Sequence, residues 1–134
     1  MRHAALLVIA ACAVACVSTN AAVMNETLIR PAISSDSVVI YLTPGDVPRK
    51  YDEVAVLNSK GNEEWTSESK MYKSMRQSAA KLGANGVIVS GMKDPSTGSK
   101  VAHALLGTSS SRKGQAIAIF VHPVGADSSV TTSH

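Results

Sequence analysis

Hydrophobic positions along the chain follow two periods, and the change between them separates strands from a helix. Residues 38–42 are an apolar, β-branched run that Pro44 ends, and residues 52–57 alternate polar with apolar side chains. Residues 87–91 and 115–121 repeat these two patterns further along the chain. Each pattern is typical of a strand, so we expect four strands.

The segment between the second and third expected strands has the period of a helix instead. Its apolar side chains recur three or four residues apart, at Met71, Met75, Ala79 and Leu82. Ser67 or Ser69 is suited to cap the start of a helix, and Gly83 is suited to follow its end, because glycine adopts the left-handed conformation without a steric penalty. The pattern predicts one helix over residues 68–82.

Together these elements predict an α+β fold in the order β-β-α-β-β, a single small four-stranded sheet with one main helix packed on one face. The chain has 134 residues, which is enough for one domain, and we place this domain at residues 37–123. Residues 16–36 are rich in Ser, Thr, Asn and Ala and are expected to be a flexible tether. The Ser- and Thr-rich residues 124–134 are expected to be a disordered tail.

A single helix covers only one face of a sheet, yet the first and last expected strands carry apolar residues on both faces. The residues left in need of another cover are Val39, Tyr41, Ala116, Ala118 and Phe120. The apolar residues 101–106 are one candidate cover, and a partner protein or a second copy of the chain is the other. Val39, Tyr41 and Phe120 are therefore our candidate interaction surface.

The first residues have the layout of a secretory signal. Arg2 precedes an apolar run of about a dozen residues, which is too short to span a bilayer. We expect residues 1–15 to be a signal peptide. The two cysteines, Cys12 and Cys16, both lie at the end of this run, so the mature domain would hold no structural disulfide.

The small residues before each cysteine resemble a bacterial lipobox, in which the cysteine is lipidated and becomes the first residue. We favour Cys16 as the lipidated residue, with Cys12 as the alternative; an ordinary signal-peptidase cut, after Ala15 for example, stays open. The residue after Cys16 is Val17 and not the Asp that often retains bacterial lipoproteins at the inner membrane. By that analogy we expect a lipid anchor in the outer membrane, facing the periplasm. Without the lipid, the protein would be soluble in the periplasm or secreted.

Residues 39–44, 50–57 and 79–89 resemble a group of small proteobacterial envelope lipoproteins of unknown function. The most specific stretch is Leu-Gly-Ala-Asn-Gly-Val-Ile at residues 82–88. A similar junction occurs in the outer-membrane lipoprotein that senses stress for the Rcs phosphorelay. That domain is stapled by disulfides, so its signalling role does not carry over. The resemblance implies an envelope location and a small sheet-and-helix fold, and it implies no catalytic residues.

The junction also has a physical explanation that needs no family. Gly83 would end the helix, while Asn85 and Gly86 allow a turn before the next strand. We therefore interpret these three residues as a structural junction.

Composition argues against several kinds of chemistry. The net charge is +3 and the basic residues are scattered, so we expect no nucleic-acid partner. The chain has no Gly-x-Ser-x-Gly elbow and no Gly-rich phosphate loop. His103 and His122 could meet near Asp94 as a minimal metal site, but their spacing matches no known ligand pattern, and we expect two ordinary histidines. We expect no metal and no cofactor.

The connection over residues 92–113 carries scattered positive charge on both sides of the apolar residues 101–106. The charged residues are Lys93, Lys100, Arg112 and Lys113. This segment is either an ordinary surface loop or a site that docks onto an anionic lipid surface or an acidic partner.

We expect a non-enzymatic envelope lipoprotein whose domain binds or senses an unknown ligand, with the membrane as one partner and an envelope protein or a second copy as another. A soluble periplasmic or secreted interaction protein is the first alternative. A small metal-dependent or hydrolytic enzyme is the second.

Overall fold

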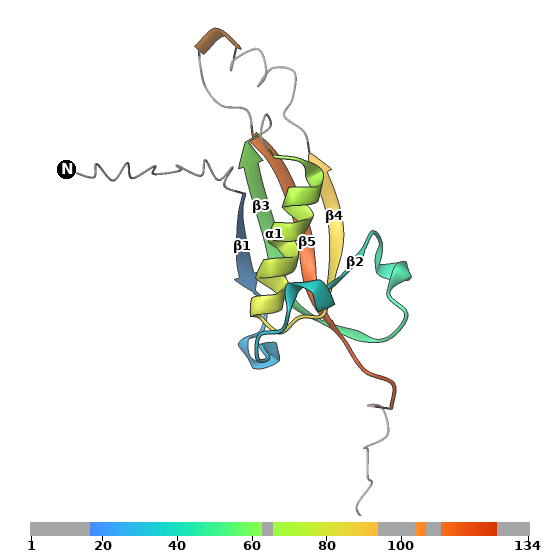
Figure 1. The fold of residues 1–134 in the computed structure, drawn as a ribbon. Coiled ribbons are helices and arrows are strands. Elements are labelled where there is room, and N and C mark those ends of the chain that lie inside the picture. The colour runs from blue at the N-terminus through green and yellow to red at the C-terminus, as the bar shows by residue number, and fades with distance from the viewer. Residues whose placement is uncertain (1–16, 63–65, 94–103, 107–110, 126–134) are drawn as a thin grey trace, which may run out of the picture.

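The computed structural model describes residues 17–62, 66–93, 104–106 and 111–125, which hold one curved sheet and one long helix (Figure 1). The predicted signal peptide at residues 1–15 and both cysteines lie outside these ranges, as do residues 126–134. The elements in chain order are β1 (Ser18–Val23), η1 (Glu26–Leu28), η2 (Ser35–Ser37), β2 (Val39–Tyr41), η3 (Pro44–Asp46), β3 (Tyr51–Asn62), α1 (Glu68–Lys81), β4 (Gly86–Lys93) and β5 (Ser111–Val121).

The strands form one sheet in the order β1-β3-β5-β4-β2. Only β2 and β4 pair in parallel, and the other neighbours are antiparallel. The α+β class with one main helix is confirmed, but the predicted number of strands is wrong, because the sheet has five strands instead of four. The additional strand is β1, which lies within the segment predicted as a tether.

The described part of that segment is bound to the domain along its length. On β1, Thr19 donates a hydrogen bond to the Ser59 hydroxyl (3.1 Å) and shares another with the Ser74 hydroxyl on α1 (2.7 Å). Beyond β1, the chain crosses the C-terminal end of α1, where the N–H groups of Arg30 and Ile33 donate to the carbonyls of Leu82 and Ala80 at 3.0 Å. Residues 17–36 are therefore part of the domain, which corrects the prediction of a flexible tether.

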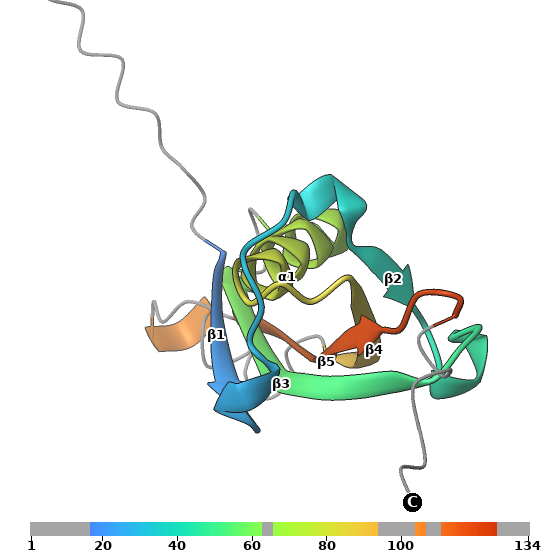
Figure 2. The same cartoon turned by 90° about the horizontal axis from the view of Figure 1, so that it is seen from below.

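The helix prediction is confirmed to within one residue. Ser67 caps the first turn by accepting a hydrogen bond from the N–H of Lys70 (3.3 Å). Met71, Met75 and Ala79 are fully buried against the sheet, as their spacing predicts. In Figure 2 the sheet curls around α1, with β1 and β2 at its two edges.

The small residues of β5 face the helix, contrary to prediction. Ala116 and Ala118 are fully buried in the core with Met75 and Ala79. At Gly114, a Cβ atom would lie 2.8 Å from the Met75 methyl, so this strand approaches α1 closely because it presents glycine and alanine there. The expectation that Ala116 and Ala118 need another cover is wrong, because alternation along the strand gives the opposite face to the isoleucines.

The two ends of the sheet differ in which strands begin and end there. At the Ser18 end, β1 begins and β3 ends; at the Asn85 end, β4 begins and β5 ends. Residues 104–106 form a short helical turn with Leu105 and Leu106 largely exposed, and Figure 1 places it beyond the Ser18 end. The described part of the predicted cover at residues 101–106 therefore does not lie over Val39. None of the helices in the described residues has the length and hydrophobicity of a membrane span.

Candidate functional site

The junction after α1 ties three strands together through Asn85. Its side-chain amide donates to the carbonyl of Val121 (2.9 Å), and its side-chain oxygen accepts from the N–H of Val121 (2.7 Å). Its backbone N–H donates to Ile119 O, and its backbone carbonyl accepts from the N–H of Val39. Asn85 thus joins the end of β5 to the start of β2.

The two glycines of the junction have packing roles. Gly83 has a φ of +71°, and a Cβ atom there would lie 2.6 Å from Arg30 Cβ. At Gly86 a Cβ atom would lie 2.9 Å from the Ile119 side chain and 3.0 Å from the Tyr41 ring. The absence of a side chain at Gly86 lets Tyr41 lie beside Ile119, which is fully buried although it faces away from α1.

A hollow of about 400 Å³ opens at the Asn85 end of the sheet, and we call it the apolar hollow. It is lined by Ser37, Val39, Tyr41, Pro48, Arg49, Asn85, Phe120, Val121 and Pro123. The structure therefore brings together Val39, Tyr41 and Phe120, the three residues of the predicted interaction surface. Val39 is 49 % exposed, and the other two are half-buried.

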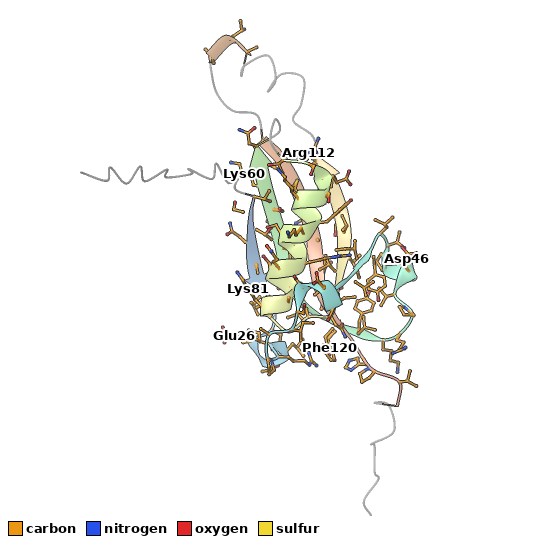
Figure 3. The ribbon with its side chains drawn as sticks, viewed as in Figure 1. Glu26, Asp46, Lys60, Lys81, Arg112 and Phe120 are labelled. Atoms are coloured by element: carbon orange, nitrogen blue, oxygen red, sulfur yellow. The ribbon has the colours of Figure 1, made fainter. Side chains whose placement is uncertain are left out.

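A cluster of charged and polar side chains contacts Phe120, which lines the apolar hollow. The Asp52 carboxylate is 3.1 Å from His122 Nε2 and 3.5 Å from the Arg30 guanidinium, and each of the three side chains is about one third exposed. The same guanidinium lies 3.6 Å from the centre of the Phe120 ring, which Figure 3 places at this end of the molecule. The His122 ring meets Phe120 edge to face. These contacts fix Phe120, one of the residues that line the apolar hollow, in place.

The proposed meeting of His122 with His103 and Asp94 lies outside the described residues, because positions 94–103 are not among them. The partner that the structure gives His122 is Asp52. Within residues 17–62, 66–93, 104–106 and 111–125, no three His, Cys, Asp or Glu side chains gather as metal ligands would. Sequence reasoning missed Arg30 and Asp52, since nothing in their local pattern shows that they meet Phe120.

A second hollow, of about 550 Å³, lies at the Ser18 end, and its most prominent feature is three lysines in one row. Lys60 on β3 is paired in register with Lys113 on β5, and Lys113 is paired with Lys93 on β4. We call these three residues the lysine row. Paired residues project from the same face of a sheet, and the next residue along β5, Gly114, faces α1. The lysine row therefore lies on the face that points away from the helix.

The residues next to the lysine row are polar and open. The adjacent register positions hold Asn20, Asn58, Gln115 and Gly91, all exposed and all lining the hollow. A Cβ atom at Gly91 would meet nothing within 4 Å, so this glycine leaves open space at the floor.

The sequence singled out Lys93 and Lys113 but placed them on a loop and missed Lys60. Arg112, named with them, turns to the other face and donates a hydrogen bond to the carbonyl of Thr66 (3.2 Å). The signal that was available is the alternation of Lys113, Gln115 and Ile117 along β5. The register that aligns Lys60 with Lys113 was not available from the sequence.

A third hollow, of about 440 Å³, lies between η2 and α1 and includes Tyr72. The Tyr72 hydroxyl donates a hydrogen bond to the Glu68 carboxylate one turn earlier. That hydrogen bond, with partial burial and the carboxylate charge as smaller causes, raises the pKa of Tyr72 above its usual value. The Tyr72 phenol is therefore protonated at neutral pH and does not act as a general base there.

Comparison with known proteins supports the fold alone. No family model matches the chain, and no curated protein is similar to it in sequence. Among solved structures, the chain resembles the crystal structure of the Francisella virulence factor FvfA in its orthorhombic form, with a TM-score of 0.52. The two chains are 14 % identical, over 76 % of this chain and 96 % of that one. At this identity the likeness extends to the arrangement of strands and helix and no further.

Proposed function

We propose that the protein is an exported envelope lipoprotein whose domain acts without catalysis, by binding or sensing a partner. The N-terminal sequence supports export: Arg2, the short apolar run and the small residues before Cys16 follow the layout of a lipoprotein signal. The resemblance of residues 82–88 to envelope lipoproteins supports the same location. With β1 beginning at Ser18, a lipid on Cys16 would hold the folded domain directly at the membrane, without a tether.

The observation that carries the binding function is the apolar hollow. Val39 and Tyr41 of β2 and Phe120 of β5 line one concave surface, which the polar residues Ser37, Arg49 and Asn85 also line. A concave apolar surface with a few oriented polar groups is typical of binding sites. A protein without the lipid anchor, soluble in the periplasm or secreted, would present the same hollow. The proposed binding function therefore does not depend on the anchor.

Photo-crosslinking from the hollow tests the binding function. A photoreactive phenylalanine analogue replaces Val39 in cells, and the matched control carries it at Gln77, an exposed position on α1. We expect a crosslinked product from position 39 that weakens when Tyr41→Ala removes part of the lining, and none from position 77. A product of the mass of two copies would identify the partner as the protein itself. Equal yields at both positions, or no product at 39, would contradict a binding role for the hollow.

Labelling with radioactive palmitate tests the anchor separately. In a host with lipoprotein-processing enzymes, we expect label on the native protein and on Cys12→Ala but not on Cys16→Ala. Label that persists when Cys12→Ala and Cys16→Ala are combined would refute the anchor. Native protein that stays unlabelled in the soluble fraction would refute it too.

A further inference from the structure

The lysine row is electrostatically unfavourable on its own. Like charges directly opposite each other on neighbouring strands repel and destabilise a sheet, and Lys113 has such a neighbour on each side. Within the described part of the chain, no carboxylate lies at ion-pair distance from Lys60, Lys93 or Lys113. Three exposed ammonium groups in one row therefore form a local site that favours an anion.

The position of the row relative to the chain start indicates which anion. Ser18, the first residue of β1, is paired in register with Lys60. Cys16 precedes Ser18 by two residues, a separation of about 7 Å at most in extended chain. If Cys16 carries the lipid, the row lies within reach of the phosphate groups of the same bilayer. Figure 3 shows Lys60 and Arg112 at this end and the acidic Glu26 and Asp46 away from it.

The hollow below the row offers groups that match a lipid head. The amides of Asn20, Asn58 and Gln115 present both hydrogen-bond donors and acceptors beside the ammonium groups. The open space at Gly91 leaves room for a polar group to enter between them. Phosphate oxygens would accept from the lysines, and hydroxyl groups of the lipid head would pair with the amides.

From this placement, and resting on the lipid anchor proposed above, we propose that the lysine row binds the phosphates of anionic lipids in the membrane that holds the anchor. The lipid on Cys16 fixes where the domain is, and the row fixes how it is oriented. A domain held by both has its Ser18 end on the bilayer and the apolar hollow, at the Asn85 end, turned away from it. The hollow then faces partners in the aqueous compartment.

The test uses the processed, lipid-anchored protein in two kinds of vesicle, phosphatidylcholine alone and phosphatidylcholine mixed with phosphatidylglycerol. An amine-acylating reagent that does not cross membranes modifies exposed lysines, and peptide mass spectrometry gives the rate at each position. Lys73 and Lys81, both exposed on α1, are the matched controls. We expect the lysines of the row to react about fivefold more slowly on the anionic vesicles, because the attraction of one lysine to an anionic membrane surface favours binding by about this factor. The reaction rates of the control lysines should change by less than about twofold. High salt should remove the protection, because it screens the charges.

The outcomes that overturn the proposal are distinct. Equal protection of the row and the helix lysines, or no protection of the row, refutes it. Protection of the row by inorganic pyrophosphate on phosphatidylcholine vesicles, without protection by phosphatidylglycerol, also refutes it, since the row would then be a site for a soluble anion. Flotation with phosphatidylcholine vesicles distinguishes a missing lipid anchor from a lysine row that does not bind anionic lipid. A protein that does not float has no anchor, which overturns the proposed function and this proposal with it, whereas a protein that floats without row protection refutes the lysine row alone.

Discussion

Replacing Lys113 with glutamine removes the middle charge of the lysine row and should make the free protein more stable. Glutamine keeps the length and polarity of the side chain, so the charge is the main change. Neighbouring strands lie about 5 Å apart, and two unit charges at that distance in water repel by about 0.8 kcal/mol. Screening at physiological salt, with a Debye length of about 8 Å, leaves about half of this value for each pair. With one charged neighbour on each side, Lys113→Gln should raise the free energy of unfolding by about 0.8 kcal/mol.

Urea denaturation of the purified protein, followed by circular dichroism, measures this change. Lys60→Gln removes only one pair and should give about half the gain, and Lys73→Gln on α1 should fall within about 0.5 kcal/mol of zero, as exposed substitutions usually do. At about 1 M salt the Debye length falls to about 3 Å, so the gain from Lys113→Gln should largely disappear. A loss of stability in Lys113→Gln, or a gain that salt leaves unchanged, would refute the reasoning, because the three charges would then not repel.

The remaining predictions concern the junction and the helix. Asn85→Ala should lower the free energy of unfolding by about 1–3 kcal/mol in urea denaturation, because it removes two hydrogen bonds to the end of β5. Gly83→Ala should lower the melting temperature, since it adds a Cβ at positive φ where there is no room, whereas Gly91→Ala, which enters open space, should leave it nearly unchanged. The pKa of Tyr72 lies above its usual value of about 10, so its contribution to stability should be present below pH ~10 and be lost as the pH rises through the raised value. Ultraviolet titration should show Tyr72 ionising at a lower pH in Glu68→Gln, and an unchanged titration would contradict the hydrogen bond as cause.

The helix and four of the strands could be predicted because each has a recognisable pattern, either a repeat of apolar positions or a short apolar run. Met71, Met75 and Ala79 repeat at the helical spacing, and they are the residues that the structure buries. The strand β1 could not be found this way, because its sequence is small and polar and its side chains are mostly exposed at the edge of the sheet. Its pairing with β3, which runs to residue 62, five residues beyond its predicted end, holds β1 in place.

The faces of β5 show a second limit of sequence patterns. Alternation establishes that Ala116 and Ala118 share one face and that Ile117 and Ile119 share the other, but not which face meets the helix. The larger residues suggested the core, whereas the close approach of α1 requires the small ones. The distance between α1 and β5 determines which face of the strand meets the helix, and this distance depends on both elements together.

The candidate sites divide in the same way. Val39, Tyr41 and Phe120 could be grouped because each is an apolar residue that needs a cover, and the structure places them in one hollow. Asp52 and Lys60 could not be found, since His122 and Lys113, which they meet through the pairing of β3 with β5, are more than fifty residues away in the chain.

The intact mass of the mature protein extracted from membranes tests the central claim most directly, because one measurement gives both the processing site and the anchor. We predict a chain that begins at Cys16 and carries acyl groups, which would place lipid two residues before β1 and next to the lysine row. A mass that matches an unmodified chain, whether full length or shortened, would contradict the lipid anchor and the membrane-held orientation that depends on it.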